Sequence, residues 1–352
     1  MASRIYSEAD RNRPQAMSSN PAAQAPFGSV LAATMAIAKV RGGAWSAPQL
    51  LATGTIEIHP AAHVLHYGST CFEGFKAYKW QDGSVNVFRL DRHAERLRQS
   101  ARALVLPEPD AAMLTEMVLE VVRRNRDAIP DAPGALYLRP LLFGTTPNIG
   151  AAATPADEAS LIVLASPVWD YFAGGARPLR IFIDDQHTRS ATHLGRVKTG
   201  GNYAAALGPT LEARREFKAD QVLFCPGGEV QETGAANFLL IRDGHIVTRS
   251  LDSTFLHGVT RDSLLTLARQ LGFKVEERVF RVDEALEWVR DGEAALSGTA
   301  AVLAGVGTLI YRGTEHRVGS GNIGPATQGL RAALVAIQQG EQPDRNHWFT
   351  RA

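Results

Sequence analysis

The chain has 352 residues and a formal net charge of +1, with 45% hydrophobic and 21% charged residues. This composition is typical of a globular protein and excludes disordered and fibrous classes, while the near-zero net charge gives no support for nucleic-acid binding. The apolar stretch at residues 30–40 is too short and too polar for a membrane span or a secretory signal. Two cysteines form neither a metal-binding spacing nor a disulfide framework. We therefore expect a cytoplasmic protein without nucleic-acid or membrane partners.

The length of the chain favours two domains. Residues 1–26 show no apolar period and are expected to form a loose tail. Residues 166–177 are rich in Pro, Gly, Trp and Asp, which predicts a connector. Strands interleave with helices without the strict alternation of a doubly wound sheet. We expect an N-terminal α+β domain over residues 27–165 and a C-terminal α+β domain over residues 178–352.

Local patterns predict the elements of the first half in chain order. Residues 84–90 alternate like a half-buried strand, and Asp91 is the expected N-cap of a helix with an apolar face over residues 94–104. A second helix has apolar residues at helical spacing over residues 114–122 and ends before Pro130. Further strands are expected at residues 135–143 and 160–165.

The second half is expected to contain strands, a hairpin and a helix. Strands are predicted at residues 179–183 and 221–225, and Asp243-Gly244 predicts a tight hairpin turn between two further strands. A helix that begins near residue 258 has Leu264, Leu267, Ala268 and Leu271 on one face. Gly272 is its expected C-cap.

A lone lysine lies in a segment of small residues, at residues 195–203 (GRVKTGGNY). Glycines next to Lys198 let the backbone and a bulky partner approach closely. A desolvated lysine beside polar groups can lose its proton and form a Schiff base. By itself the segment favours the commoner alternative, a solvated turn lysine.

An acid occupies a similar small-residue segment at residues 231–237 (QETGAAN). A carboxylate bonded to a pyridine nitrogen keeps that nitrogen protonated, and the ring then accepts electrons from a carbanion. Glu232 suits this role, although a solvated turn glutamate is the commoner alternative for an isolated acid.

Two segments are candidate anion sites. The helix that opens at residues 258–262 (GVTRD) offers free amides and a favourable dipole to a phosphate, with the Thr260 hydroxyl as a further donor. Thr260 is equally compatible with an ordinary N-cap. Residues 297–300 (SGTA) either bind a second anion or form a tight turn.

Two other kinds of site are excluded by their patterns. The glycines around Lys198 do not form a nucleotide-binding P-loop motif. His59, His63 and His66 have helical spacing, but Pro60 interrupts a continuous helix and neither an acid nor a cysteine completes a metal shell. We therefore expect no metal.

The ordered set of lysine segment, acid segment, GVTR helix start and SGTA turn resembles the fold-type IV pyridoxal-phosphate enzymes, and within them the branched-chain amino-acid aminotransferases. Residues 66–68 (HYG), 71–78 (CFEGFKAY) and 137–140 (YLRP) are also similar to that family's signature segments. The resemblance runs from about residue 27 to residue 349, and the long N-terminal approach is closer to the larger branch that includes the animal enzymes. It implies two α+β domains with the cofactor at their interface, and a homodimer in which the neighbour completes each site.

The resemblance also implies roles for individual residues. Lys198 holds pyridoxal 5′-phosphate and shuttles the substrate Cα proton, Tyr203 bonds the ring hydroxyl and Glu232 bonds the ring nitrogen. The cofactor phosphate is expected on Arg96, Val259, Thr260 and Thr299. The substrate is expected on Tyr67, Phe72, Tyr137, Arg139, Tyr171, Thr299 and Ala300.

The activity implied is ping-pong transfer of the amino group of L-leucine, L-isoleucine or L-valine to 2-oxoglutarate, giving L-glutamate. Alternatives within the same fold are a D-amino-acid or (R)-amine transaminase and aminodeoxychorismate lyase, against which the chain length and residues 72–74 (FEG) argue. A pyridoxal-phosphate-binding protein without turnover would lack the lysine, the acid or the arginine, and all three are present. Two departures from the family are His257 in place of a proline and the lack of a CxxC pair after residue 300.

Overall fold

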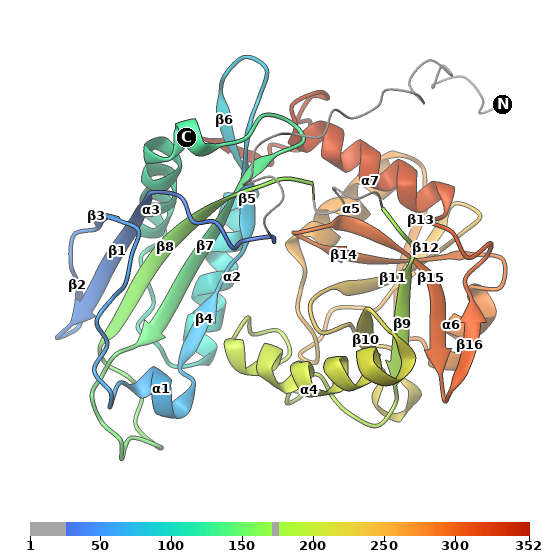
Figure 1. Cartoon of the computed structure of the whole chain (residues 1–352), viewed down its shortest axis with the longest axis horizontal. Helices are drawn as coiled ribbons and strands as arrows, with labels where there is room; N and C mark the ends of the chain where they lie inside the picture. The colour runs from blue at the N-terminus through green and yellow to red at the C-terminus, as the bar shows by residue number, and fades with distance from the viewer. Residues whose placement is uncertain (1–25, 171–175) are drawn as a thin grey trace.

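The computed structural model describes residues 26–170 and 176–352, and it contains two sheets that lie side by side (Figure 1). Nearly all of the expected tail and part of the expected connector, including Tyr171, lie outside the described residues. Within the described ranges, the helices are all too short or too polar to cross a membrane. The architecture is the expected α+β class.

The first sheet is antiparallel throughout. Its strands run in the order β17-β6-β5-β7-β8-β1-β2, with β3 paired to β1 and β4 paired to β7. The bounds are β1 (Thr34–Arg41), β2 (Ala44–Trp45), β3 (Gln49–Ala52), β4 (Thr70–Phe72), β5 (Phe75–Lys79), β6 (Val85–Phe88), β7 (Ala135–Gly144), β8 (Ala159–Val168) and β17 (Phe349–Arg351). The predicted strands at residues 84–90, 135–143 and 160–165 are confirmed as β6, β7 and β8.

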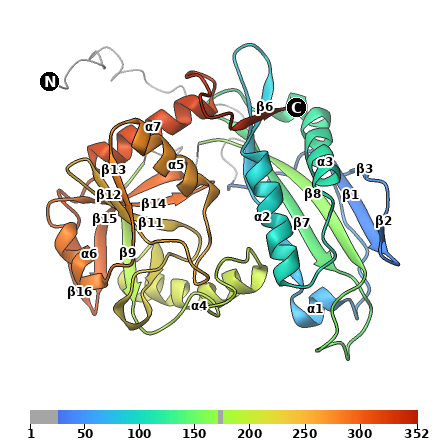
Figure 2. The same ribbon diagram turned by 180° about the vertical axis from the view of Figure 1, so that it is seen from behind.

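Two helices cover one face of this sheet, and α1 (His63–Tyr67) lies at its lower end (Figure 1). The predicted apolar face of α3 (Ala111–Arg124) is buried in the core. The helix α2 (Leu90–Ala103) lies between the two sheets when the molecule is seen from behind (Figure 2). The expectation that Asp91 caps α2 is wrong. The N-cap is Arg89, with a left-handed φ of 53°, and Asp91 lies within the first turn. The Asp91 carboxylate in the first turn still complements the helix dipole.

The second sheet is mixed. Its order is β10-β9-β15-β14-β11-β12-β13, with β16 paired to β15, and the pairs β10/β9, β9/β15 and β12/β13 are parallel. The bounds are β9 (Leu179–Asp184), β10 (Gln221–Phe224), β11 (Asn237–Arg242), β12 (His245–Thr248), β13 (Lys274–Glu277), β14 (Glu293–Gly298), β15 (Val302–Tyr311) and β16 (Thr314–Arg317). The predicted strands and the hairpin are confirmed here. Asp243 and Gly244 have φ of 49° and 71°, as a type I′ turn requires.

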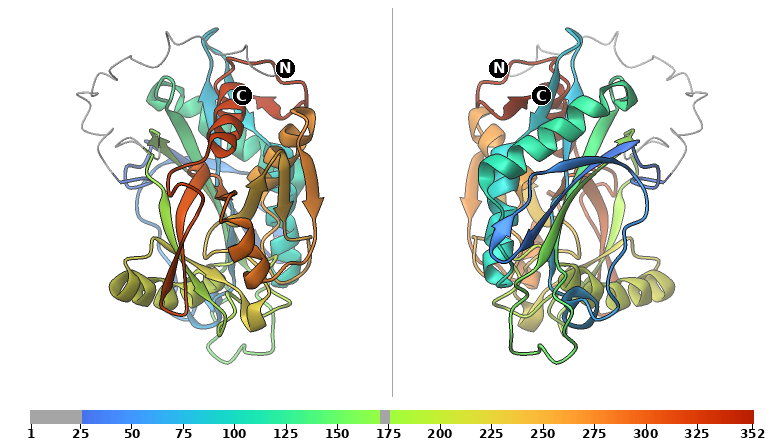
Figure 3. Two further views of the ribbon diagram at one scale, coloured as in Figure 1. Left: turned by 90° about the vertical axis from the view of Figure 1, so that its right-hand side faces the viewer. Right: turned by 90° about the vertical axis from the view of Figure 1, so that its left-hand side faces the viewer.

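Helices cover both faces of the second sheet (Figure 3). The helices α5 (Val259–Gln270) and α7 (Pro325–Gln338) share one apolar cluster with the sheet, and α6 (Val282–Trp288) packs in another cluster with Phe238 and Leu240. The helix α4 (Gly200–Phe217) packs near β10, and its first turn points toward the first sheet (Figure 1). This arrangement brings the starts of α4 and α5 to the boundary between the sheets.

Two boundaries differ from the expected ones. The helix α5 ends at Gln270, so Leu271 is the C-cap and is exposed, while Gly272 follows it with φ of 87°. The strand β8 continues to Val168, and β17 pairs with β6 of the first sheet although it lies far along the chain. The domain limits at residues 27–165 and 178–352 stay predictions.

The difference between Leu264 in α5 and Leu271, the C-cap of α5, gives a stability test. Leu264 is 1% exposed and Leu271 is 54% exposed. Leu264→Ala is expected to lower the free energy of unfolding by about 2–5 kcal/mol because it leaves a cavity. Leu271→Ala should change it by less than about 1 kcal/mol. Urea unfolding of both variants checks the packing, and equal losses would contradict it.

Candidate active site

Side chains and backbone from both halves meet at the boundary between the sheets. The Arg96 Nη1 on α2 donates a 2.8 Å hydrogen bond to the carbonyl of His257, which precedes α5. The Lys198 amide donates to Ser100 Oγ on α2 at 3.1 Å. The Phe72 amide at the end of β4 donates to the Lys198 carbonyl at 3.0 Å. The lysine, the arginine and the start of α5 are thereby fixed relative to one another.

Lys198 lies two residues before α4 and is half-buried. Its Nζ donates a 2.6 Å hydrogen bond to the hydroxyl of Tyr203 in the first turns of the helix, and it lies 5.0 Å from the centre of the Phe72 ring. Asn202 holds the preceding loop through hydrogen bonds from its amide to two carbonyls of that loop. An amine held beside a phenol and an aromatic ring in this way is suited to act as a nucleophile.

Glu232 is buried, and its two oxygens have different partners. Oε1 accepts a 2.8 Å hydrogen bond from the Leu256 amide and lies 2.7 Å from Arg189 Nε, although that N–H does not point at it as a hydrogen bond requires. Oε2 accepts a 3.0 Å hydrogen bond from Asn237. Burial raises the pKa of Glu232 to about 7, against the lowering effects of Arg189, Lys198 and Arg96. A carboxylate oxygen accepts more than one hydrogen bond, so Oε2 can take a further donor.

Arg96 is held by a buried carboxylate. Its Nε and Nη2 donate to the two oxygens of Glu73 at 2.6 and 2.8 Å, and His93 Nδ1 lies 2.6 Å from Glu73 Oε2. Burial favours the neutral form of Glu73, but Arg96 and His93 outweigh it and hold the pKa of this carboxyl well below its usual range. The fork-like contact fixes the guanidinium in one orientation.

The start of α5 faces Arg96. The N-cap is Gly258 and no side chain caps the helix, so the alternative role of Thr260 as N-cap is wrong. Val259 and Thr260 are buried in the first turn, where amides have no partner within the helix. A Cβ at Gly258 would lie 2.0 Å from Asn237 Oδ1, which explains the glycine. Together with Arg96, these amides are suited to bind an anion.

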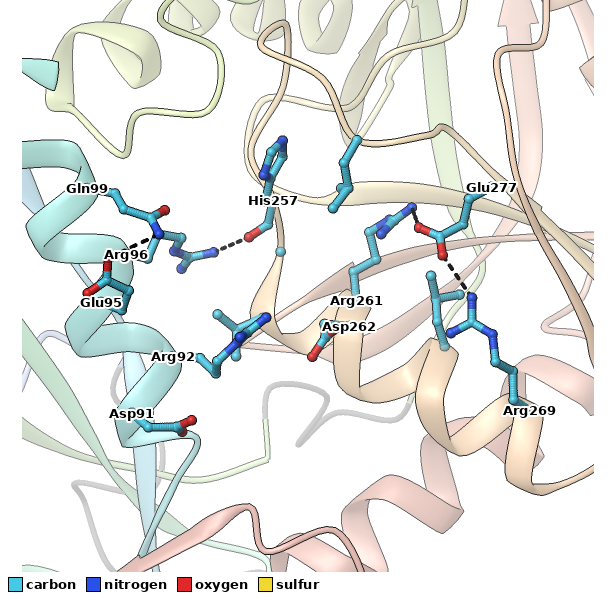
Figure 4. A pocket seen from close by; sticks show the side chains of 14 residues that line it. Asp91, Arg92, Glu95, Arg96, Gln99, His257, Arg261, Asp262, Arg269 and Glu277 are labelled. Atoms are coloured by element: carbon cyan, nitrogen blue, oxygen red, sulfur yellow. Dashed lines mark hydrogen bonds and ion pairs between the residues drawn. The ribbon is translucent and has the colours of Figure 1, made fainter.

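A polar cavity of about 510 Å³ adjoins this anion site between α2 and α5 (Figure 4). Arg96, His257, Gly258 and Val259 form part of its wall. The arginines and carboxylates labelled in Figure 4 lie on α2 and α5, except for Glu277, which lies at the end of β13. The anion site is therefore bordered by a charged cavity.

Residues of the first sheet form another side of the site. Tyr137 and Arg139 share a face of β7, and Arg139 Nη2 donates a 2.9 Å hydrogen bond to the Tyr137 hydroxyl. The Arg139 guanidinium lies 4.7 Å from the centre of the Phe72 ring, and this ring lies 5.2 Å from that of Tyr203. A Cβ at Gly74 would lie 1.9 Å from the Tyr137 hydroxyl, so the glycine makes room for it.

The SGTA segment covers the last two residues of β14 and the turn after it. Lys76 Nζ donates a 3.0 Å hydrogen bond to the Ala300 carbonyl and ties the turn to β5. Burial lowers the pKa of Lys76 to about 8. Ser297 Oγ is buried without a hydrogen-bond partner within the described part of the chain. Thr299 is half-buried and lies between Ser297 and Ala300 in the sequence.

The structure gives Tyr67 a different setting. Its hydroxyl donates to the carbonyl of Ile149, and its ring contacts His63 and His66 at the exposed end of α1. These contacts connect Tyr67 to its own surface region, whereas Phe72 and Tyr203 lie beside Lys198. Tyr171 is outside the described residues.

Three buried polar residues at the site were not assigned a role from the sequence. Glu73 orients Arg96, and Arg189 and Asn237 contact Glu232. Glu73 and Asn237 stand beside apolar residues in the sequence, which is an available signal for a buried polar role. Arg189 has no such local signal, because its ion-pair partner Glu232 lies in another segment.

Known proteins resemble this chain over most of its length. Residues 70–307 match the family "Amino-transferase class IV". The branched-chain-amino-acid aminotransferase of Mycobacterium tuberculosis is 38% identical over 88% of this chain and 87% of that protein. The chain belongs to the branched-chain aminotransferases of class IV. The chloroplastic branched-chain-amino-acid aminotransferase 5 of Arabidopsis thaliana is 37% identical over 88% of this chain and 74% of that protein.

Solved structures of branched-chain aminotransferases have the same fold. The T.th. enzyme with pyridoxamine 5′-phosphate has a TM-score of 0.75 at 26% identity and covers 91% of this chain and 99% of that chain. The Escherichia coli enzyme has a TM-score of 0.73 at 28% identity and covers 86% and 96%. This establishes fold-type IV for the aminotransferase.

The residues present fit pyridoxal phosphate, as an aminotransferase of this class requires. A ring with an aldehyde, a basic nitrogen and a phosphate needs an amine, a carboxylate and an anion site. Lys198, Glu232 and the uncapped start of α5 supply these groups, and Arg96 adds a fixed positive charge. The protein therefore has a suitable group for the aldehyde, for the ring nitrogen and for the phosphate of the cofactor.

The close approach at Gly258 gives a test of the anion site. Gly258→Ala is expected to displace Asn237 or the start of α5 and to weaken pyridoxal-phosphate binding by about tenfold or more, a loss of about 1.4 kcal/mol. Fluorescence titration of the cofactor-free protein measures the dissociation constant. Gly329→Ala in α7 is the control, because nothing lies within 4 Å of its added Cβ. Equal affinities for the two variants would contradict this geometry.

Proposed function

We propose that the chain transfers the amino group of L-leucine, L-isoleucine or L-valine to 2-oxoglutarate. Pyridoxal-phosphate-dependent transamination follows from its membership of the family, and the substrates are those that the names of its relatives state. The roles of individual residues are part of the proposal. The cytoplasmic location is also a proposal, supported by two buried free cysteines, Cys71 and Cys225.

One observation carries the proposal. The Lys198 amine, 2.6 Å from the Tyr203 hydroxyl, shares its surroundings with a buried acid, Glu232, and a buried cation, Arg96. When bound, pyridoxal phosphate supplies an aldehyde for the amine and an electron sink for the substrate Cα. The three side chains fit the three polar ends of that molecule.

Lys198 is the catalytic residue of the proposal. Its amine would hold the bound cofactor, and the free Nζ would take the proton from the substrate Cα. The hydroxyl of Tyr203 accepts a hydrogen bond from Nζ and so orients it. The loop carbonyls bonded to Asn202 keep the lysine backbone in place while the side chain moves.

The remaining cofactor-binding roles follow from charge. Glu232 would hold the proton at the ring nitrogen of the bound cofactor. Arg96, Val259, Thr260 and Thr299 are proposed to bind the phosphate. This arrangement places the negative cofactor phosphate near a fixed cation and a positive helix end.

The substrate side combines cations, amides and an aromatic wall. Tyr137, Arg139 and the amides of Thr299 and Ala300 are proposed to bind the substrate carboxylate. Phe72 offers an apolar wall to a branched side chain. Each methylene contributes only about 1–3 kcal/mol to discrimination in such a pocket, so leucine, isoleucine and valine are all expected to react.

The choice of substrate can be tested by absorbance. L-leucine alone is expected to convert the visible band of the lysine-bound cofactor into the pyridoxamine form, and 2-oxoglutarate is expected to restore it. D-alanine is the parallel control for the D-amino-acid alternative. A response to D-alanine and none to L-leucine would move the chain to a sister activity.

Replacement of the lysine tests the nucleophile. Lys198→Ala is expected to lower the transamination rate by roughly 10²–10⁴-fold or more, because both the covalent attachment and the proton transfer are lost. Lys274→Ala, at an exposed lysine of β13, should leave the rate unchanged. Coupled assay of glutamate formation measures both variants. Full turnover by Lys198→Ala would place the nucleophile elsewhere.

We also propose a homodimer in which Tyr67 serves the neighbouring site. Leu207 and Leu211 on α4 are 56% and 50% exposed. Leu65 and Ile149, which are exposed beside Tyr67, form a second apolar area. Exposed apolar areas of this kind mark interfaces. A second copy of the chain would cover these two apolar areas. It would also allow Tyr67 of one chain to reach Lys198 of the other chain.

Mixed variants test the shared site. Equal amounts of Lys198→Ala and Tyr67→Ala protein, exchanged between dimers, are expected to recover activity, because one site then has both native residues. Activity no higher than the two separate variants would show that Tyr67 acts within its own chain. Light scattering of Leu207→Glu/Leu211→Glu, with Leu271→Glu as the control, measures the oligomeric state, and an unchanged mass for the double variant would contradict the α4 interface.

A further inference from the structure

Arg189 is a buried arginine with 2% of its surface exposed, in the segment between β9 and Lys198. Its Nε lies 2.7 Å from Glu232 Oε1. Its Nη2 donates a 2.9 Å hydrogen bond to the carbonyl of Gly195, three residues before the lysine. One guanidinium therefore touches both the acid and the loop that carries the nucleophile.

We propose that Arg189 is a positioning residue whose guanidinium supplies the permanent positive charge facing Glu232 and ties this carboxylate to the loop of Lys198. The proposal deepens the proposed function and rests on it, because it takes Glu232 as the partner of the ring nitrogen. Arg189 touches neither substrate nor cofactor in this role. It acts through the two residues that do.

Three charged and two neutral groups face Glu232. The charged ones are Arg189, Lys198 and Arg96, and the neutral donors are the Leu256 amide and Asn237. Lys198 changes its proton count during the reaction because it accepts the Cα proton. An arginine does not lose its proton in a protein. Arg189 therefore provides a positive charge that is the same at every stage.

The charge of Arg96 is already balanced. Its Nε and Nη2 contact both oxygens of Glu73, which is buried and ionised. The Arg189 guanidinium has Glu232 as its ion-pair partner. Burial alone raises the pKa of Glu232, and Arg189 is the first of the charges that oppose it, which leaves a pKa of about 7. Without Arg189 the carboxyl would hold its proton to higher pH.

The effect of Arg189 on the pKa of Glu232 decides whether the shared proton lies on this carboxyl group or on the ring nitrogen. A carboxyl group and a pyridine nitrogen that form a hydrogen bond share a single proton. A positive charge beside the carboxylate favours the form with the proton on the nitrogen, which is the form that accepts electrons. Arg189 thus acts on the reaction through the ionisation of Glu232.

The loop before Lys198 is held by contacts with more than one segment. A Cβ at Gly195 would lie 2.1 Å from the backbone of Thr254, so the loop runs directly against another segment. The side-chain amide of Asn202 donates hydrogen bonds to the Leu194 and Val197 carbonyls. The hydrogen bond from Arg189 to Gly195 is directional, whereas its contact with Glu232 is an ion pair without hydrogen-bond geometry. Charge and tether are therefore separable by substitution.

The charge is tested in the cofactor-free protein by ¹³C NMR titration of glutamate carboxyl groups, with Glu232→Gln identifying the signal. The native midpoint is expected near pH 7. Arg189→Met should move it upward by roughly 1–3 pH units, the usual effect of removing an opposite charge. Arg89→Met removes another buried arginine, whose partner is Asp262, and should leave it unchanged. An unchanged midpoint in Arg189→Met would overturn the proposal.

Arg189→Lys separates the two roles and also serves if Arg189→Met does not fold. The lysine keeps the charge, so the Glu232 midpoint should stay within about one pH unit of the native value, while the planar link to Gly195 is lost. Amide hydrogen exchange over residues 195–198 is then expected to rise by about tenfold. A Glu232 midpoint displaced as far as in Arg189→Met would contradict the role of the charge. Amide hydrogen exchange equal to that of the native protein would contradict the role of the tether.

The proposed function is tested separately. If Glu232 is the partner of the ring nitrogen, Glu232→Gln changes the pH profile of the bound-cofactor absorbance. If it does not change, the assignment of Glu232 fails. The carboxyl titration of the cofactor-free variants still reports whether Arg189 controls the acid, so the two failures are distinguishable.

Discussion

The guanidinium of Arg96 joins the two halves of the molecule, and the site depends on this contact. Two of its nitrogens bond Glu73 of the first half, and a third bonds the His257 carbonyl before α5. Removing one partner of a buried ion pair costs about 3–5 kcal/mol because the other charge is left uncompensated. This contact therefore helps to fix the start of α5 relative to α2. Arg89, which bonds Ser263 and Asp262 on α5, adds a second link of the same kind.

Two buried carboxylates at this boundary have opposite ionisation behaviour. Glu73 receives a directional fork from Arg96 and a contact from His93, and its pKa lies well below the usual range. Glu232 has a single oxygen beside Arg189 and two neutral donors, and its pKa is about 7. Glu73 is therefore a fixed charge that orients a neighbour. Glu232 can exchange a proton near neutral pH, which suits a group that shares one with a ring nitrogen.

Local patterns in the sequence predicted the elements that depend on near neighbours. The apolar period of α3 and the Asp243-Gly244 hairpin are confirmed because burial and turn geometry are local there. The predicted start of α2 was wrong by two residues, since Arg89, which contacts α5 and Trp348, is the N-cap in a left-handed conformation. The ordered motifs identified Lys198, Glu232 and Arg96 as candidates. The partners of those residues, such as Arg189 and Glu73, depend on distant segments and could not be read from spacing.

The pairing of β17 with β6 has a consequence for the order in which the protein forms. Phe349 lies opposite Phe88, and the Arg89 amide bonds the Trp348 carbonyl just before α2 begins. The edge of the first sheet is thus completed by a segment that leaves the ribosome long after its partner. Until then β6 is an unprotected edge, open to pairing with other chains. During synthesis the early half must wait for residues that follow the whole second sheet, so an interrupted chain is expected to be more prone to aggregation than the finished one.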